Sequence, residues 1–126
     1  MKNKNTYWII AGGISVITFF VHLIIGQIDL INPLIESGLT TQVKTELLAV
    51  WHMISLLLLA TSVVFIFFGI KNFPTSITIC LLSNLYLAFG LIFIIVSIYT
   101  MTFAPQWILL LPIGIFGLLG IKKHSL

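Results

Sequence analysis

Two histidines are the residues of this sequence whose types and positions most clearly suggest chemistry. His22 lies near the end of a first long apolar segment that closes at Ile28, and His52 lies near the start of a second one that follows Thr45. If both segments are helices, a rise of about 1.5 Å per residue places the imidazoles about 9 Å and about 10 Å from the same end of an antiparallel pair. An ionisable side chain inside an apolar membrane segment indicates a functional site. We therefore predict a site that contains both histidines at one depth.

Polar side chains accompany each histidine along one helix face. They are Ser15, Thr18, His22 and Asp29 in the first segment and His52, Ser55 and Ser62 in the second. Polar groups in a bilayer turn toward the protein interior, because each unsatisfied one costs several kcal/mol. We expect the two faces to meet each other or a shared cavity, with Thr18, Ser55 and Trp51 as the polar shell around the histidines.

The polar residues between the two segments would lie above the histidines. Gln27, Asp29 and Glu46 form this candidate external mouth, and Glu36 and Lys44 lie between them in the sequence. One interpretation is an ordinary solvated membrane interface. The other is a vestibule whose acidic groups attract cations or a cationic substrate toward the histidines.

Two imidazoles allow several kinds of chemistry. Imidazole is a good ligand for zinc and copper, but a structural zinc site has four ligands and a catalytic one has three from the protein. A haem held between His22 and His52 would need more room than the roughly 8–10 Å that separates neighbouring helices. A transition metal (Zn or Cu) or haem stays open as a cofactor, beside a proton- or substrate-handling pocket. The alternative without any ligand is a hydrogen bond between helices, worth about 0.6 kcal/mol on average in membranes.

The composition indicates that lipid is the solvent of nearly the whole chain. Of the 126 residues, 60% are hydrophobic and 7% are charged, with a mean hydropathy of +1.21, whereas a soluble domain carries about 25% charged residues. A helix crosses the hydrocarbon core with about 20 apolar residues. We predict a single membrane domain, residues 1–126, with spans at about 7–28, 47–70, 77–99 and 103–121. Pro105 and Pro112 interrupt the fourth span, and we expect a kink at Pro112.

The lysines predict the orientation of these spans. Lys2 and Lys4 precede the first span, Lys71 lies between the second and third, and Lys122 and Lys123 follow the fourth. With four spans all five lie on one side, which the positive-inside rule makes cytoplasmic. Short connections between the later spans favour antiparallel neighbours. The prediction is an all-α integral membrane four-helix up-down bundle with both termini cytoplasmic, in a bacterial cytoplasmic membrane. The dispersed lysines argue against a nucleic-acid partner, which would need a clustered basic face.

Other residues predict contacts between helices. Gly114, Gly117 and Gly120 recur every third residue in the fourth span and indicate close backbone packing, either within the bundle or in a homodimer or with a partner membrane protein. Asn84 lies in the third span, where a carboxamide usually bonds to a neighbouring helix. Between the first two spans, residues 33–37 predict a short interfacial helix that ends at Gly38.

The residues around the histidines resemble a known pattern. His22-x3-Gly26, then Pro33-Leu34, then Trp51-His52 look like the skeleton of a group of small, functionally uncharacterised four-span bacterial membrane proteins. The resemblance covers roughly the first half of the chain. It implies that His22 and the Trp51-His52 pair define the site, and it implies no activity.

Three classes of function follow from these observations. The leading hypothesis is a membrane protein that binds a small ligand, a transition metal or haem at His22 and His52 in the outer leaflet. The alternative is a non-catalytic interaction or accessory subunit, of the immunity or assembly type. An enzyme acting on a lipid-soluble substrate is the third and least favoured class, because no carboxylate lies deep in a span and no nucleophile–base pair is visible.

Overall fold

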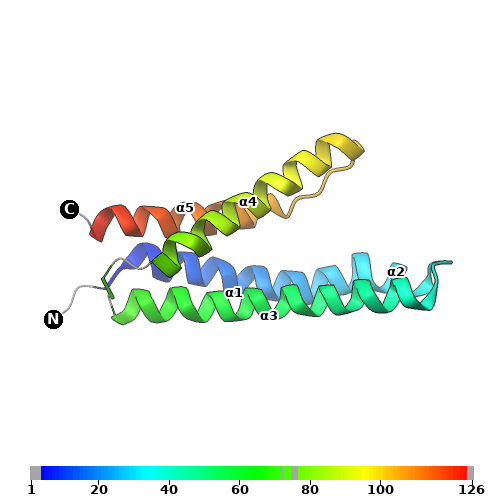
Figure 1. Ribbon diagram of the computed structural model, residues 1–126, viewed down its shortest axis with the longest axis horizontal. Helices are drawn as coiled ribbons and strands as arrows, with labels where there is room; N and C mark the ends of the chain where they lie inside the picture. The colour runs from blue at the N-terminus through cyan, green and yellow to red at the C-terminus, as the bar shows by residue number, and fades with distance from the viewer. Residues whose placement is uncertain (1–3, 72, 75–76, 125–126) are drawn as a thin grey trace.

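All regular secondary structure in the described part of the chain is helical. The computed structural model describes residues 4–71, 73–74 and 77–124. Within them the elements are α1 (Thr6–Gly26), the π-helix η1 (Gln27–Ile31), α2 (Asn32–Glu36), α3 (Thr41–Lys71), α4 (Ile77–Thr100) and α5 (Trp107–His124). Figure 1 shows these helices as a bundle. The predicted all-α class is confirmed.

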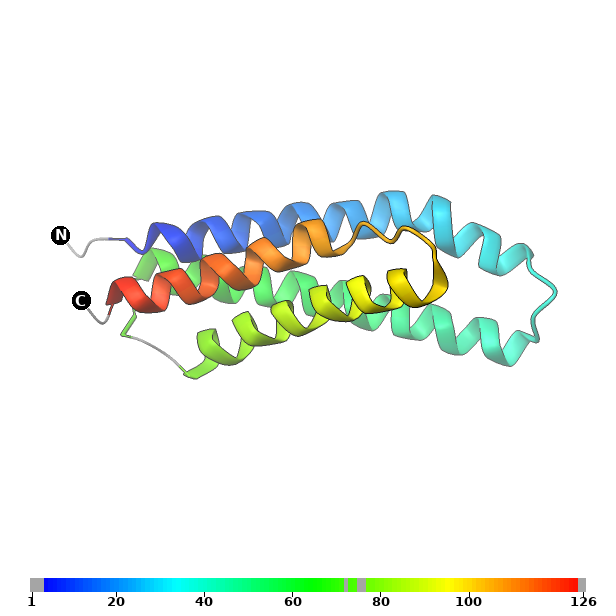
Figure 2. The ribbon, with the colours of Figure 1, turned by 90° about the horizontal axis from the view of Figure 1, so that it is seen from above.

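Two helical hairpins build the bundle. The helix α1, continued by η1 and α2, packs antiparallel against α3, and α4 packs against α5. The two hairpins meet mainly where α1 packs against α5. The start of α1 and the end of α5 lie at the same end of the bundle, which we call the terminal end (Figures 1 and 2). The opposite end, where α2 leads into α3, is called the hairpin end.

Three helical segments are long and apolar enough to cross a membrane. They are Thr6–Glu36, Thr41–Lys71 and Ile77–Thr100. The fourth apolar helix begins at Trp107, not near residue 103 as the sequence suggested, and its apolar part, Trp107–Lys122, is shorter. It begins late because Pro105 and its neighbours form turns, as expected for a residue that cannot donate a backbone hydrogen bond.

The α1–α3 hairpin is longer than the predicted spans. Each of its arms, Thr6–Glu36 and Thr41–Lys71, has 31 residues, or about 46 Å at the rise of an α-helix. The hydrocarbon core of a bilayer is about 30 Å thick. Most of the predicted external loop is therefore helical, and the expected helix at 33–37 is α2. Figure 2 shows this hairpin extending beyond the turn between α4 and α5.

The register of α1 against α3 is set by contacts between backbones and small residues. At the terminal end the Asn5 N–H donates to the Gly69 carbonyl at 2.9 Å. Further along, the Ser15 hydroxyl donates to the Leu58 carbonyl at 3.2 Å. The contacts advance by similar steps along both helices, so His22 on α1 lies level with Trp51 and His52 on α3.

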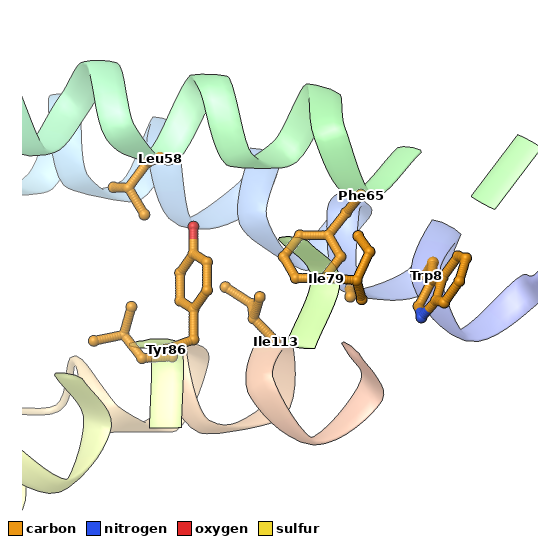
Figure 3. Packing of buried hydrophobic residues seen from close by; sticks show 8 residues of the cluster. Trp8, Leu58, Phe65, Ile79, Tyr86 and Ile113 are labelled. Atoms are coloured by element: carbon orange, nitrogen blue, oxygen red, sulfur yellow. The ribbon is translucent and has the colours of Figure 1, made fainter. Parts of the chain in front are cut away.

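The buried core occupies the part of the bundle nearer the terminal end. It includes Trp8, Phe65, Ile79, Tyr86 and Ile113, whose side chains converge in Figure 3. The buried residues nearest the hairpin end are Thr18 in α1, Ser55 in α3, Gly90 in α4 and Leu110 in α5. Beyond them, only Ile31 is buried among the described residues. Figure 1 shows that α4 diverges from the α1–α3 pair toward the hairpin end. The two hairpins therefore separate just beyond Thr18 and Ser55.

The three glycines of α5 face the inside of the bundle. A Cβ at Gly114 would lie 2.7 Å from the Ser83 carbonyl oxygen, a Cβ at Gly117 would overlap the Ser83 hydroxyl, and a Cβ at Gly120 would overlap the Trp8 indole. The carbonyls of Gly117 and Gly120 accept hydrogen bonds from Trp8 Nε1 at 3.0 Å and from Asn5 Nδ2 at 2.9 Å. Of the two predicted uses of these glycines, the structure shows packing within the chain.

Candidate functional site

His22 lies flat against Trp51. The centroids of the two rings are 3.6 Å apart and their planes are inclined by 17°. His22 Nε2 is 3.3 Å from the Trp51 carbonyl oxygen. Because a carbonyl can only accept, this hydrogen bond requires a proton on Nε2, and the neutral imidazole then has its lone pair on Nδ1. His22 thus offers a hydrogen-bond acceptor at Nδ1.

Trp51 is held from both helices of the hairpin. Its carbonyl oxygen also accepts a hydrogen bond from Ser55 Oγ at 3.0 Å. Its indole lies across α1 at Gly26, where a Cβ would overlap the ring. The absence of a side chain at Gly26 therefore allows the indole to stack on His22. Within the described chain the buried Trp51 Nε1 has no hydrogen-bond partner, a state that costs about 1–3 kcal/mol unless an acceptor is supplied.

The helix geometry changes next to this cluster. Directly after Gly26, α1 passes into the π-helix η1, in which Asn32 N–H donates to the Gln27 carbonyl. Single π turns within α-helices occur frequently at functional sites, because they displace side chains and leave backbone groups rearranged. The π turn therefore begins where the Trp51 indole rests on α1.

His52 occupies a different position from the one expected. It lies level with His22 along the hairpin, but its side chain is exposed and has no hydrogen-bond partner among the described residues. Trp51, expected in the supporting shell, is the residue that faces His22. The physical reason is that Trp51, Leu58 and Phe65 recur at heptad spacing on the inward face of α3, and Leu58 and Phe65 are buried. The next residue, His52, is rotated by about 100° away from that face.

The two hydroxyls of the predicted shell are both buried but have different roles. Ser55 reaches the site, because it shares the Trp51 carbonyl with His22. Thr18 Oγ1 donates to the Ile14 carbonyl of its own helix at 2.8 Å. Ser55 is therefore part of the cluster, whereas Thr18 lies one turn below His22 with its donor already used.

The predicted external mouth is spread along the surface of the hairpin. Gln27 donates to Asn32 Oδ1 at 3.0 Å, and Glu46 accepts from Gln42 at 3.0 Å. Asp29 and Glu46 are exposed. Gln27 and Glu46 thus bond to neighbours on their own arm of the hairpin and not to the histidines.

The side chains at the site can be compared with those that a metal ion or haem would need. In the part of the chain that the structure describes, no group of three or more His, Cys, Asp or Glu side chains could hold a metal ion. For haem, Nε2 of His22 donates to the Trp51 carbonyl oxygen, so Nδ1 is the His22 nitrogen whose lone pair could bind iron. The site offers one hydrogen-bond acceptor, Nδ1 of His22, and the exposed imidazole of His52, whereas the unpaired Trp51 Nε1 is buried.

A second polar cluster, not recognised in the sequence, lies in the core. Tyr86 is 2% exposed, and its hydroxyl is 3.0 Å from Ser15 Oγ and is hydrogen-bonded to Thr61 Oγ1. Figure 3 shows the hydroxyl pointing from α4 toward Leu58. The available signal was a tyrosine in the middle of a span, because a buried tyrosine hydroxyl almost always has a partner. Its partners could not be predicted without the packing of α4 against α1 and α3.

Comparison of the chain with protein-family models, curated proteins and solved structures finds no match. The fold and the site define a class by themselves: an all-helical bundle with apolar helices long enough for a membrane and an aromatic–imidazole cluster where its two hairpins separate. The pattern that this sequence resembles has three parts, His22-x3-Gly26, Pro33-Leu34 and Trp51-His52, and they do not all lie at the same place in the fold. Trp51 contacts both His22 and Gly26, whereas Pro33 and Leu34 lie in α2.

Proposed function

We propose that this chain is a membrane protein that binds a small amphiphilic molecule from the outer leaflet of a bacterial cytoplasmic membrane. The observation that carries the proposal is the His22–Trp51 stack just beyond the end of the buried core, with Nε2 of His22 committed to a carbonyl and Nδ1 available. A ligand head group that donates a hydrogen bond would be accepted by Nδ1.

The depth of His22 supports an amphiphile as the ligand. Lys4 and Lys71 flank the Asn5–Gly69 contact at the terminal end, and we place that end at the cytoplasmic surface by the positive-inside rule. His22 is then about 26 Å from that level along α1. In a hydrocarbon core about 30 Å thick, this is close to the outer boundary, where the head groups and chains of amphiphiles meet.

The surroundings of the cluster support access through lipid. Exposed apolar side chains flank it on both helices, including Phe20 at 54% and Met53 at 68% exposed. The core ends at Thr18 and Ser55, below the level of His22. A molecule dissolved in the outer leaflet would therefore reach the cluster laterally, without crossing the packed part of the bundle.

The charge at the hairpin end favours a neutral or cationic head group. Asp29, Glu36 and Glu46 lie on this part of the chain with Lys44 as the opposing charge. An acidic surface raises the local concentration of cations and lowers that of anions. Combined with an acceptor at Nδ1, this indicates an alcohol, phenol or amine head group and disfavours a carboxylate.

The proposal can be tested with three probes that share a twelve-carbon chain: dodecanol, dodecylamine and dodecanoate. Binding would be measured by native mass spectrometry of the protein released from lipid nanodiscs. We expect the alcohol and the amine to bind more tightly than the carboxylate. The variant His22→Phe keeps a ring to stack on Trp51 and removes the acceptor, so its affinity should fall about fivefold, which corresponds to one hydrogen bond of about 1 kcal/mol.

The matched control is Thr18→Val, one turn away on the same helix. Thr18 bonds only to its own helix, so this variant should bind the probes as the parent protein does. Equal affinities of the parent protein and His22→Phe for dodecanol and dodecylamine would show that Nδ1 of His22 does not bind the head group, and would refute the proposal.

A further inference from the structure

Asn84 is a polar residue on the exposed face of α4. It lies about 10 Å along the helix from Ile77. Its Nδ2 donates to the Cys80 carbonyl at 2.8 Å and is 3.5 Å from Cys80 Sγ, both on its own helix. The side-chain carbonyl oxygen accepts no hydrogen bond from the described residues. The sequence predicted a hydrogen bond to a neighbouring helix, and Asn84 makes none to another helix among the described residues.

An exposed carboxamide at this position is costly if lipid covers it. Transfer of an unpaired amide from water into hydrocarbon costs several kcal/mol. By contrast, the hydroxyl groups of Ser83 and Thr61 in the same part of the bundle are buried and hydrogen-bonded. Asn84 is therefore better explained by a polar partner that covers it than by contact with lipid.

The residues around Asn84 form a regular stripe, which we call the α4 seam. Its members are Leu81, Asn84, Ala88, Leu91 and Ile95, spaced alternately by three and four residues, and all are exposed. This spacing is the a/d pattern with which two helices pack side by side. The small Ala88 lies one turn from Asn84, where it would allow two backbones to approach closely.

We infer that the α4 seam binds a second copy of this chain, with the two α4 helices parallel around a two-fold axis along the membrane normal. Copies inserted in the same orientation place equivalent residues at equal depth, so Asn84 of each copy meets Asn84 of the other. A carboxamide is self-complementary, because it has two N–H donors and one oxygen acceptor. One N–H of each Asn84 stays on Cys80, and the other donates to the carbonyl oxygen of the opposite Asn84.

Self-complementarity and the absence of charge argue for a second copy over a different partner. No residue of the seam is charged, so nothing in it would select an oppositely charged helix. A single asparagine in such a seam is also known to favour dimers in fixed register. This inference does not depend on the proposed ligand site, because the seam contains neither His22 nor Trp51.

Cys80 is a natural reporter for the proposed interface. It is the single cysteine of the sequence and lies one turn from Asn84, partly exposed. In membranes prepared at low protein density, a short bismaleimide should cross-link two copies of the parent protein through Cys80. Asn84→Leu should reduce the cross-linked fraction severalfold, and Asn84→Gln, which keeps a carboxamide, should retain most of it.

A matched control separates a specific interface from random collision. Val63 on α3 is 59% exposed on a different helix, so the double variant Cys80→Ser/Val63→Cys should give little cross-linked product under the same conditions. Single-molecule photobleaching of labelled protein in lipid provides a second measure of the number of copies per complex. Absence of cross-linking in the parent protein, equal cross-linking by Asn84→Leu, or equal cross-linking through position 63 would overturn the inference.

Discussion

At the scale of single residues, the site depends on one missing side chain as much as on the rings that are present. The Trp51 indole can lie on α1 only because Gly26 has no Cβ. The stacked position of His22 follows from that arrangement, and so does the tautomer in which Nε2 carries the proton and donates it to the Trp51 carbonyl.

We predict that Gly26→Ala displaces the indole and destabilises the protein by about 1–3 kcal/mol, the usual cost of forcing extra volume into a packed contact. Thermal unfolding in detergent and the tryptophan fluorescence spectrum would both report the change. The control is Gly13→Ala in the same helix, where a Cβ would meet nothing within 4 Å. That substitution should be neutral or slightly stabilising, because alanine favours the helix by about 1 kcal/mol over glycine. Equal behaviour of the two variants would show that the Gly26–Trp51 contact is not formed.

At the scale of helices, the structure is a pair of hairpins joined by few polar contacts. The Tyr86 hydroxyl connects α4 to Ser15 on α1 and to Thr61 on α3. Two contacts join these hydroxyls to each other, and three join them to the carbonyls of Leu57 and Leu58, all within hydrogen-bonding distance. The three hydroxyls have only three protons for these five contacts, so not all of them can be hydrogen bonds at once. If one hydroxyl is removed, the other two can still donate to a remaining acceptor.

For this reason we expect Tyr86→Phe to have a moderate effect, a loss of about 1 kcal/mol in the free energy of unfolding. The measurement is the midpoint of chemical or thermal unfolding in a fixed detergent. Tyr99→Phe, at a position 87% exposed on the same helix, is the control and should leave the midpoint unchanged. If both variants unfold at the parent midpoint, the hydroxyl cluster contributes nothing to the association of the hairpins.

At the scale of the whole molecule, the lysines and the apolar lengths together predict a topology. If the terminal end of the bundle faces the cytoplasm, as the positive-inside rule predicts, the turn between α2 and α3 lies outside the cell. This proposed orientation decides from which leaflet a ligand would reach His22.

We expect Gly38→Cys, in a Cys80→Ser background, to react with a membrane-impermeant maleimide in intact cells. Gly38 is exposed, and a Cβ there would meet nothing within 4 Å, so the substitution should be tolerated. Lys4→Cys in the same background should react only after the membrane is permeabilised. The opposite pattern would reverse the topology and place the His22 cluster in the inner leaflet.

Some features of this protein follow from the sequence alone, because they depend on length and composition. The apolar lengths predict the four principal helices, and the 1.5 Å rise per residue predicts that His22 and His52 lie at the same level along the hairpin. The boundaries were less accurate: α3 begins at Thr41 and α5 at Trp107, because lipid-facing and protein-facing apolar residues look alike and helices extend beyond the hydrocarbon core.

Tertiary packing decided which side chains meet. Trp51 and His52 are neighbours in the sequence, and only the rotation of α3, set by burial of Leu58 and Phe65 on its inward face, turns the indole toward His22. The same applies to Asn84 and the α5 glycines, which were expected to join helices. The glycines pack inside the bundle and Asn84 faces outward. In lipid, every face of an apolar helix is compatible with the solvent, so composition cannot determine the rotation of a helix and close contacts between neighbours must do so.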